Sequence, residues 1–391
     1  MTQVDISHDR ELGSVLLLLA PAITIVVASE FIVVGLLPLI AADVGVSLTQ
    51  AGMMTAIFAL SAAVVGPAIT LAATRYSHRS VLVAALVLFA AMNAVIAFST
   101  DFYAMLAARA AQGAILPAFI SVGADAVTKL APPEKRGRAL ANANIGFVLG
   151  LIFALPAGLV LAKGGNWRLP FEVLTVLPIA MAVLFTMLFP AIGRSDAPSL
   201  KGQLGLLRQP AFLGHLALTI VLFGAMFSAY TYLAAWLENG LGLSITSIAI
   251  ALFVFSLAGM IGNNVAAAVA DKKPLQATAV GATFLVVAVN VAAFVHGSLI
   301  QAAIPLLLWS VTHTALVTLS QVRVTMAGGK SAAFAMTLNI STANLGIAVG
   351  TMAGGKVLDS VGVNAIGWAP AGFLAAILVL ALLLAQKRSK N

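Results

Sequence analysis

Two opposite charges inside long apolar runs are the residues of this 391-residue sequence best placed to do chemistry. Glu30 lies in the run Ala28-Ser-Glu-Phe31, and Arg109 lies in the run Ala108-Arg-Ala-Ala-Gln-Gly113. An ionisable side chain at the centre of a membrane helix costs roughly 2.5–3.5 kcal/mol, so it needs a partner or a water-filled cavity. A carboxyl group away from water holds its proton more tightly, and a nearby arginine weakens that hold. Glu30 beside Arg109 could therefore bind and release protons.

Two other interpretations of this pair stay open. The two residues could form a static ion pair that pins one helix to another, or they could contact a solute without exchanging protons. His313 is the one histidine deep in an apolar run, and histidine titrates near neutral pH. It could equally be a hydrogen-bonded histidine of a helix bundle. We expect a solute cavity lined by Glu30, Arg109, Gln112, Met226, Tyr230 and His313.

The composition requires that lipid cover most of the surface. Of the residues, 61% are hydrophobic and 9% are charged, whereas a soluble domain averages about 25% charged residues. The formal net charge of +8 does not indicate a nucleic-acid partner, because the basic residues stand in short clusters between apolar runs. There is no cysteine, no phosphate-binding loop, no nucleophile elbow and no His-Glu metal motif. We therefore expect no enzyme, no cofactor and no metal site.

The apolar runs are long enough to span a membrane many times. A span needs about 20 mostly apolar residues. Twelve candidates result, at residues 13–40, 51–73, 79–98, 103–130, 138–161, 168–189, 211–236, 245–270, 274–295, 299–326, 332–358 and 365–385. The longest polar stretch, Ala191 to Gln209, separates the sixth from the seventh. We predict a six-helix half at 1–190, a cytoplasmic linker at 191–209 and a second six-helix half at 210–391.

The basic residues predict how the spans are oriented. Lysine and arginine concentrate in the cytoplasmic loops of membrane proteins. With both termini inside, only Lys163, Arg168 and Lys356 of the 21 basic residues fall outside, and Arg109 falls within a span. Both ends of the chain are therefore predicted to be cytoplasmic.

A repeated pattern indicates that the two halves share one plan. Asn144-x-Gly146-x-x-x-Gly150 recurs 200 residues later as Asn344-x-Gly346-x-x-x-Gly350. The segment Gly45–Thr49 resembles Gly242–Thr246 at an offset of 197. Chance recurrence of small residues is the alternative. Two parallel halves of this kind are a transporter architecture, with the solute site near the membrane midplane.

Two further groups of residues suggest moving parts. Asp125 is predicted near the cytoplasmic face beside Arg75 and Arg79, where it could be a gate latch or a solvated loop contact. Small residues and a proline in the fifth span indicate close helix packing, which either holds the bundle together or lets the halves slide. They are Gly146, Gly150, Pro156 and Gly158.

The second half shows no charged residue deep in a predicted span. We therefore expect a mostly apolar cavity with amide, hydroxyl and aromatic edges beside the Glu30–Arg109 pair. Such a cavity suits small neutral or amphipathic solutes better than a polyanion.

These motifs resemble the major facilitator superfamily over essentially the whole chain, and more narrowly its twelve-helix drug–proton antiporter branch. The resemblance rests on Ser29-Glu30-Phe31 with Gly35-Leu-Leu-Pro38, Arg109 with Gln112-Gly113, the glycines and proline of the fifth span, Pro132–Ala139, and Gly165 with Trp167-Arg168. It implies that Arg109 takes part in proton coupling, and that Asp125 pairs with the loop before the third span. That loop departs from the family pattern at Thr74 and Ser77, while its copy in the second half keeps an acid, Asp271.

The resemblance implies proton-coupled efflux of small amphipathic drugs or metabolites by alternating access across a bacterial inner membrane. The expected partners are a small-molecule solute, protons and the lipid bilayer, and we expect a monomer. One alternative is a sugar or nucleoside exporter of the same fold. Another is a non-transporting sensor or scaffold, which would need a soluble signalling domain that the sequence does not show. A channel is disfavoured by the duplicated halves and the lack of a charged ring.

Overall fold

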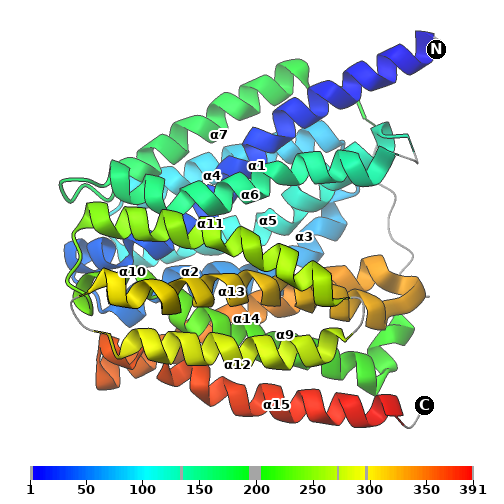
Figure 1. Ribbon diagram of the computed structural model, residues 1–391. Coiled ribbons are helices and arrows are strands. Elements are labelled where there is room, and N and C mark those ends of the chain that lie inside the picture. Colours follow the sequence, from blue (N-terminus) through cyan, green and yellow to red (C-terminus); the bar gives the residue numbers. More distant parts are fainter. Residues whose placement is uncertain (1–2, 133–134, 193–203, 271–272, 296–297, 390–391) are drawn as a thin grey trace. The chain divides into compact units, whose positions relative to one another are not determined.

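The computed structural model describes residues 3–132, 135–192, 204–270, 273–295 and 298–389, and within these ranges every regular element is a helix (Figure 1). The first half contains α1 (Gln3–Val44), α2 (Leu48–Val64), α3 (Gly66–Ala73), α4 (His78–Phe98), α5 (Phe102–Leu130), α6 (Arg136–Leu161) and α7 (Leu169–Leu188). The second half contains η2 (Leu204–Arg208), α9 (Pro210–Tyr230), α10 (Leu233–Asn239), α11 (Ile245–Ala270), α12 (Pro274–Ala293), α13 (Leu299–Gly328), η3 (Gly329–Ser331), α14 (Ala332–Val361), η4 (Val363–Ala365) and α15 (Trp368–Ser389).

The helices match the predicted spans. Among the described residues, ten helices are long and apolar enough to cross a membrane, and the bent pair α2 and α3 would make an eleventh. The remaining predicted span, residues 332–358, lies within the 30-residue helix α14. The predicted class, an all-α membrane protein that crosses the bilayer many times, is confirmed.

The sequence did not predict two interruptions. The bend of 50° between α2 and α3 falls just before Gly66 and Pro67. Proline has no N–H for the preceding turn and crowds it, so the helix breaks there. A Cβ at Gly66 would approach Pro117 of α5 to 2.6 Å, so the glycine lets α3 pack closely on α5. The second interruption separates α9 from α10 at Thr231 and Tyr232.

The contacts divide the chain into two compact units. One unit comprises Met1–Leu36 with Val64–Pro198, and the other comprises Leu37–Ala63 with Ser199–Asn391. In the first unit α4 packs between α5 and α7. In the second, α9 packs on α14 and α15, and α13 packs on α11 and α12. The predicted division at residues 190 and 210 stays a prediction, and most of the predicted linker lies outside the described residues.

Matching glycine contacts confirm the internal repeat. A Cβ at Gly146 of α6 would overlap the carbonyl oxygen of Ala20 in α1. A Cβ at Gly346 of α14 would meet the carbonyl oxygen of Ile220 in α9 at 2.5 Å. Both members of the second pair stand 200 residues after those of the first. The two units therefore build the same close helix crossing, and an offset of 200 relates equivalent positions of α1 and α9 and of α6 and α14.

The other residues of the predicted packing motif lie in the same crossing. A Cβ at Gly150 would lie 2.7 Å from the Val27 side chain, and one at Gly158 would lie 2.5 Å from Ile32. Pro156 is buried inside α6. Only glycine lets α6 approach α1 so closely, so these residues position α1, which carries Glu30.

Candidate functional site

Arg109 joins α5 to the middle of α1. Its side chain is fully buried, and its Nη1 atom donates to the Ser29 carbonyl at 2.8 Å. Its Nη2 atom donates to the Glu30 carbonyl at 2.9 Å. A third bond, of 3.1 Å, runs from Nη1 to Gln112 Oε1 one turn along α5. The predicted pinning of the first span to the fourth is therefore made through the main chain of α1.

A chain of neutral polar groups extends this contact to two more helices. Gln112 Nε2 donates to Asn93 Oδ1 of α4 at 2.9 Å. Asn93 Nδ2 donates to Ser29 Oγ at 3.1 Å and to the Leu174 carbonyl of α7 at 2.9 Å. Asn93, Arg109, Gln112 and Ser29 are all buried. Because buried polar groups need partners, this network fixes the guanidinium in one place.

Glu30 is the accessible member of the group. Its side chain is half-buried, whereas Arg109 is fully buried. The two recorded bonds from the guanidinium to α1 end on the carbonyl oxygens of Ser29 and of Glu30 itself, which places the positive charge beside this residue. The unit thus combines a fixed buried cation with a neighbouring carboxyl group that the surroundings can reach.

The second unit has an aromatic cluster on α9, α11 and α13. Tyr230 of α9 stands 200 residues after Glu30 of α1, and Trp309 of α13 packs on Phe255 of α11. The ring of His313 lies 4.8 Å from that of Tyr230 and 5.4 Å from that of Phe227, centroid to centroid. Met226, predicted to line the cavity, is fully buried on α9. The repeat therefore places charge in one unit where it places aromatic rings in the other.

Two nitrogen atoms of this aromatic cluster have no recorded hydrogen bond. They are Trp309 Nε1 and His313 Nδ1, and both are buried. An unpaired buried polar group costs about 1–3 kcal/mol, so each such group in a native protein calls for an explanation. The alternative in which His313 is a fully hydrogen-bonded histidine of the helix bundle is therefore not supported at its Nδ1 atom.

The predicted latch has a different partner. Asp125 Oδ2 lies 2.7 Å from Nε2 of the buried residue His78 and 3.6 Å from Lys129 Nζ. Arg79 instead donates to the Thr186 carbonyl of α7 at 3.4 Å, and Arg75 is exposed. The sequence predicted the arginines because they stand in the loop that Asp125 was expected to face, whereas the structure brings His78 to the carboxylate. Asp271 lies outside the described residues.

The sequence did not predict that a charged residue of the second half is buried among helices. Arg323, assigned to the cytoplasmic loop, is 2% exposed inside α13. The predicted tenth span ended at residue 326, three residues after Arg323. The positive-inside rule places a basic residue so near the end of a span in the cytoplasmic loop. In the structure the Arg323 side chain bonds to His215 and Thr219 of α9, so α13 and α9 bury the guanidinium between them.

Comparison with known proteins agrees with this fold. The model of the family described as Major Facilitator Superfamily matches residues 19–332. The chain belongs to that superfamily of transporters, so it is a multi-pass membrane protein of a family whose members carry small molecules and are generally not enzymes.

Individual relatives cover most of the chain. It is 29% identical over 333 residues to "Inner membrane transport protein YdhP" of Escherichia coli K12, with 85% of each chain covered. It is 33% identical over 279 residues to "Chloramphenicol resistance protein" of Streptomyces lividans, with 70% of each covered. The crystal structure of a bacterial homolog to the human lysosomal transporter Spinster, inward-facing and occupied, matches with a TM-score of 0.82 at 17% identity, covering 96% of this chain and 97% of that one. That likeness concerns the fold alone.

Proposed function

We propose that the protein is a proton-coupled exporter of small amphipathic drugs or metabolites. It would act by alternating access in a bacterial inner membrane, as a monomer with both termini cytoplasmic. The observation that carries the proposal is the half-buried carboxyl group of Glu30 beside the fully buried guanidinium of Arg109. Both residues lie within helices that are long and apolar enough to cross a membrane.

Glu30 is the proton-binding group in this proposal. Desolvation favours the neutral carboxylic acid, and a nearby cation favours the carboxylate, so small changes around the pair alter how tightly the proton is held. Arg109 acts as a positioning residue, because its three recorded bonds keep the positive charge in one place. A solute that approaches Glu30 would change its hydration, and this links solute binding to proton release.

The proposed solute is small, partly apolar and able to accept or donate a hydrogen bond. The aromatic cluster of the second unit supplies flat apolar surfaces, and His313 and Trp309 supply polar nitrogens. The printed name of the Streptomyces lividans relative, which refers to chloramphenicol, supports a compact amphipathic molecule of this kind. Gln112 and Met226 remain proposed cavity residues, and Asp125 with Arg75, Arg79 and Asp271 remains a proposed gate.

Transport in proteoliposomes tests the proposal. An imposed pH gradient should drive uptake of chloramphenicol or another member of a solute panel into inside-out vesicles, with fucose and uridine included to test the sugar and nucleoside alternatives. Glu30→Gln keeps the size and polarity of the side chain and should abolish gradient-driven movement. Glu172→Gln is the matched control, because Glu172 lies in the first turn of α7 and its side chain makes none of the recorded bonds of the Arg109 network. Normal gradient-driven transport by Glu30→Gln would remove the proton role from Glu30.

A further inference from the structure

Arg323 makes all its recorded bonds to neutral groups. Its Nη1 atom donates to the His215 carbonyl at 2.8 Å and lies 3.0 Å from His215 Nδ1. Its Nη2 atom donates to Thr219 Oγ1 at 3.0 Å. Its Nε atom is buried and has no recorded partner. The guanidinium therefore joins α13 to α9 and keeps part of its hydrogen-bonding capacity unused.

No carboxylate in the surrounding helices offsets this charge. Helices α9, α12, α13 and α15 contain no aspartate or glutamate, and the one acid of α14, Asp359, stands near its far end. From α14 the neutral Asn339 bonds to Thr219 and Ser320, which extends the polar cluster. At the same end of α9, η2 carries the exposed Arg208. The charged side chain recorded in contact with His215 is the guanidinium of Arg323.

The chemistry of the contact determines the state of the imidazole. Arginine has only donors and stays protonated in proteins. His215 Nδ1 must therefore accept, and the ring proton must lie on Nε2. Protonation of Nδ1 would place two donors of like charge 3.0 Å apart. The bond to Arg323 and the charged form of His215 exclude each other.

The corresponding helices of the first unit cross without such a pair. At the offset of 200, α1 has Val15 and Leu19 in place of His215 and Thr219, and Gly123 of α5 packs against Leu19. A Cβ at Gly123 would lie 3.1 Å from the Leu19 side chain, so the equivalent helices approach there without any charge. A buried cation bonded to a histidine, present at only one of two corresponding crossings, calls for a role other than packing.

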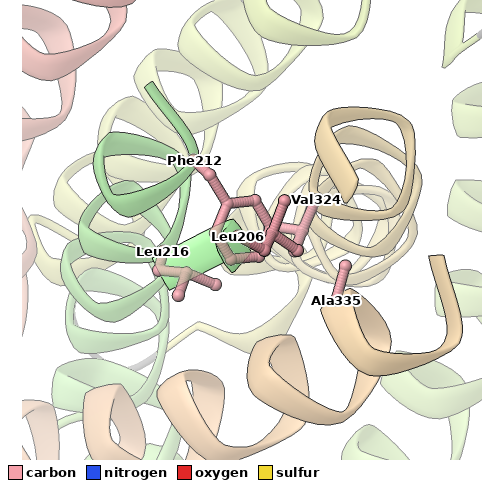
Figure 2. Close-up of a cluster of buried hydrophobic side chains, with 5 residues drawn as sticks. All are labelled: Leu206, Phe212, Leu216, Val324 and Ala335. Atoms are coloured by element: carbon pink, nitrogen blue, oxygen red, sulfur yellow. The ribbon is translucent and has the colours of Figure 1, made fainter. Parts of the chain in front are cut away.

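An apolar cluster holds the same helices together independently of the pair. Figure 2 shows Leu206 of η2 beside Phe212 and Leu216 of α9 and Val324 of α13, with Ala335 of α14 completing the cluster. Leu216 and Val324 directly follow His215 and Arg323 in sequence. A change in the His215–Arg323 contact can therefore occur while α9 and α13 stay packed.

Water can reach this end of the unit. A hollow of about 410 Å³ lies among the ends of η2, α13 and α14, and its lining includes Gln209, Ala327 and Ser331. Ala327 is one helical turn beyond Arg323, and His215 is itself partly exposed. The imidazole is thus within reach of exchangeable protons.

We propose that His215 is a second proton-binding residue of the carrier, located in the second unit, and that it takes up a proton when its bond to Arg323 breaks. The role of His215 in transport rests on the proposed proton coupling, whereas its protonation does not. The proton comes from water, and the bond that breaks is the hydrogen bond from Arg323 Nη1 to His215 Nδ1. No other group changes its covalent state.

Nitrogen NMR on the full chain in lipid bilayers tests the structural part. With labelled histidine and arginine, and with His215→Asn used to assign the signal, neutral His215 should show a proton on Nε2 and a correlation from Nδ1 to Arg323. Between about pH 8 and pH 5, where histidine titrates, the imidazolium signal should appear as that correlation disappears. A proton on Nδ1 in the neutral form, a correlation that survives protonation, or a ring that stays neutral throughout would overturn the proposal.

Transport tests the use of the site. His215→Asn retains an acceptor for Arg323 but cannot take up a proton, so the fold should persist and the export rate should lose its dependence on pH over the range in which His215 titrates. A wild-type pH profile in His215→Asn would refute a transport role. If Glu30→Gln transports normally while His215 passes the NMR test, the role proposed for Glu30 fails and the proton site on His215 stands.

Discussion

Replacing Asn93 by leucine should destabilise the first unit and displace Arg109. Asn93 accepts one bond from Gln112 and donates two, to Ser29 and to the Leu174 carbonyl. Hydrogen bonds between membrane helices contribute about 0.6 kcal/mol on average and up to about 1.7. The loss of three therefore predicts a decrease of about 2–5 kcal/mol in the free energy of unfolding. Gln112 would lose its acceptor and hold Arg109 less firmly.

Reversible unfolding in mixed micelles measures this free energy, with transport of the same variant measured alongside. Asn344→Leu is the matched control, since the Nδ2 atom of Asn344 bonds only to the Ile340 carbonyl of its own helix and its Oδ1 atom has no recorded partner. We expect the control to be neutral or slightly stabilising. Equal stability of Asn93→Leu and the wild type, with unchanged transport, would refute the claim that this network positions Arg109.

Three further predictions concern packing, the gate and the aromatic cluster. Gly146→Ala should lower the free energy of unfolding by about 1–3 kcal/mol through overpacking, because the added Cβ would overlap the Ala20 carbonyl. Gly137→Ala on the same helix meets open space and should be neutral or stabilising. Equal effects of the two changes on the free energy of unfolding would contradict this prediction. Asp125→Asn should weaken the contact with His78 and speed the labelling of a Thr128→Cys reporter by an impermeant maleimide. The reporter is the single thiol, because the chain has no cysteine. An unchanged labelling rate would count against a gate. His313→Phe keeps a ring but removes both nitrogens and should raise the KM for chloramphenicol about 2- to 10-fold, as expected for one lost hydrogen bond; an unchanged KM would place His313 outside the solute site.

The sequence predicts the helices well because each span is a long apolar run that must satisfy its backbone internally. The Gly146–Gly150 pattern and its copy also predict the repeat, and the structure confirms it through contacts with Ala20 and Ile220. The same offset predicts that Tyr230 occupies the place of Glu30.

Other features depend on how distant segments meet. Asn93 bonds to residues 64 and 81 positions away, and no local pattern encodes such pairs. The bond between His78 and Asp125 depends on the angle at which α4 and α5 meet. The positive-inside rule assigned Arg323 to a cytoplasmic loop because this residue lies near the end of a span. The rule takes no account of the neighbouring helices that bury the side chain.

Proton release on solute binding tests the central claim most directly. Purified protein in weakly buffered detergent, mixed with saturating chloramphenicol and a pH indicator, should release protons in the wild type and in Glu172→Gln. Glu30→Gln should bind the solute without releasing them, because the group proposed to give up the proton is gone. Equal proton release by Glu30→Gln and the wild type would contradict the account.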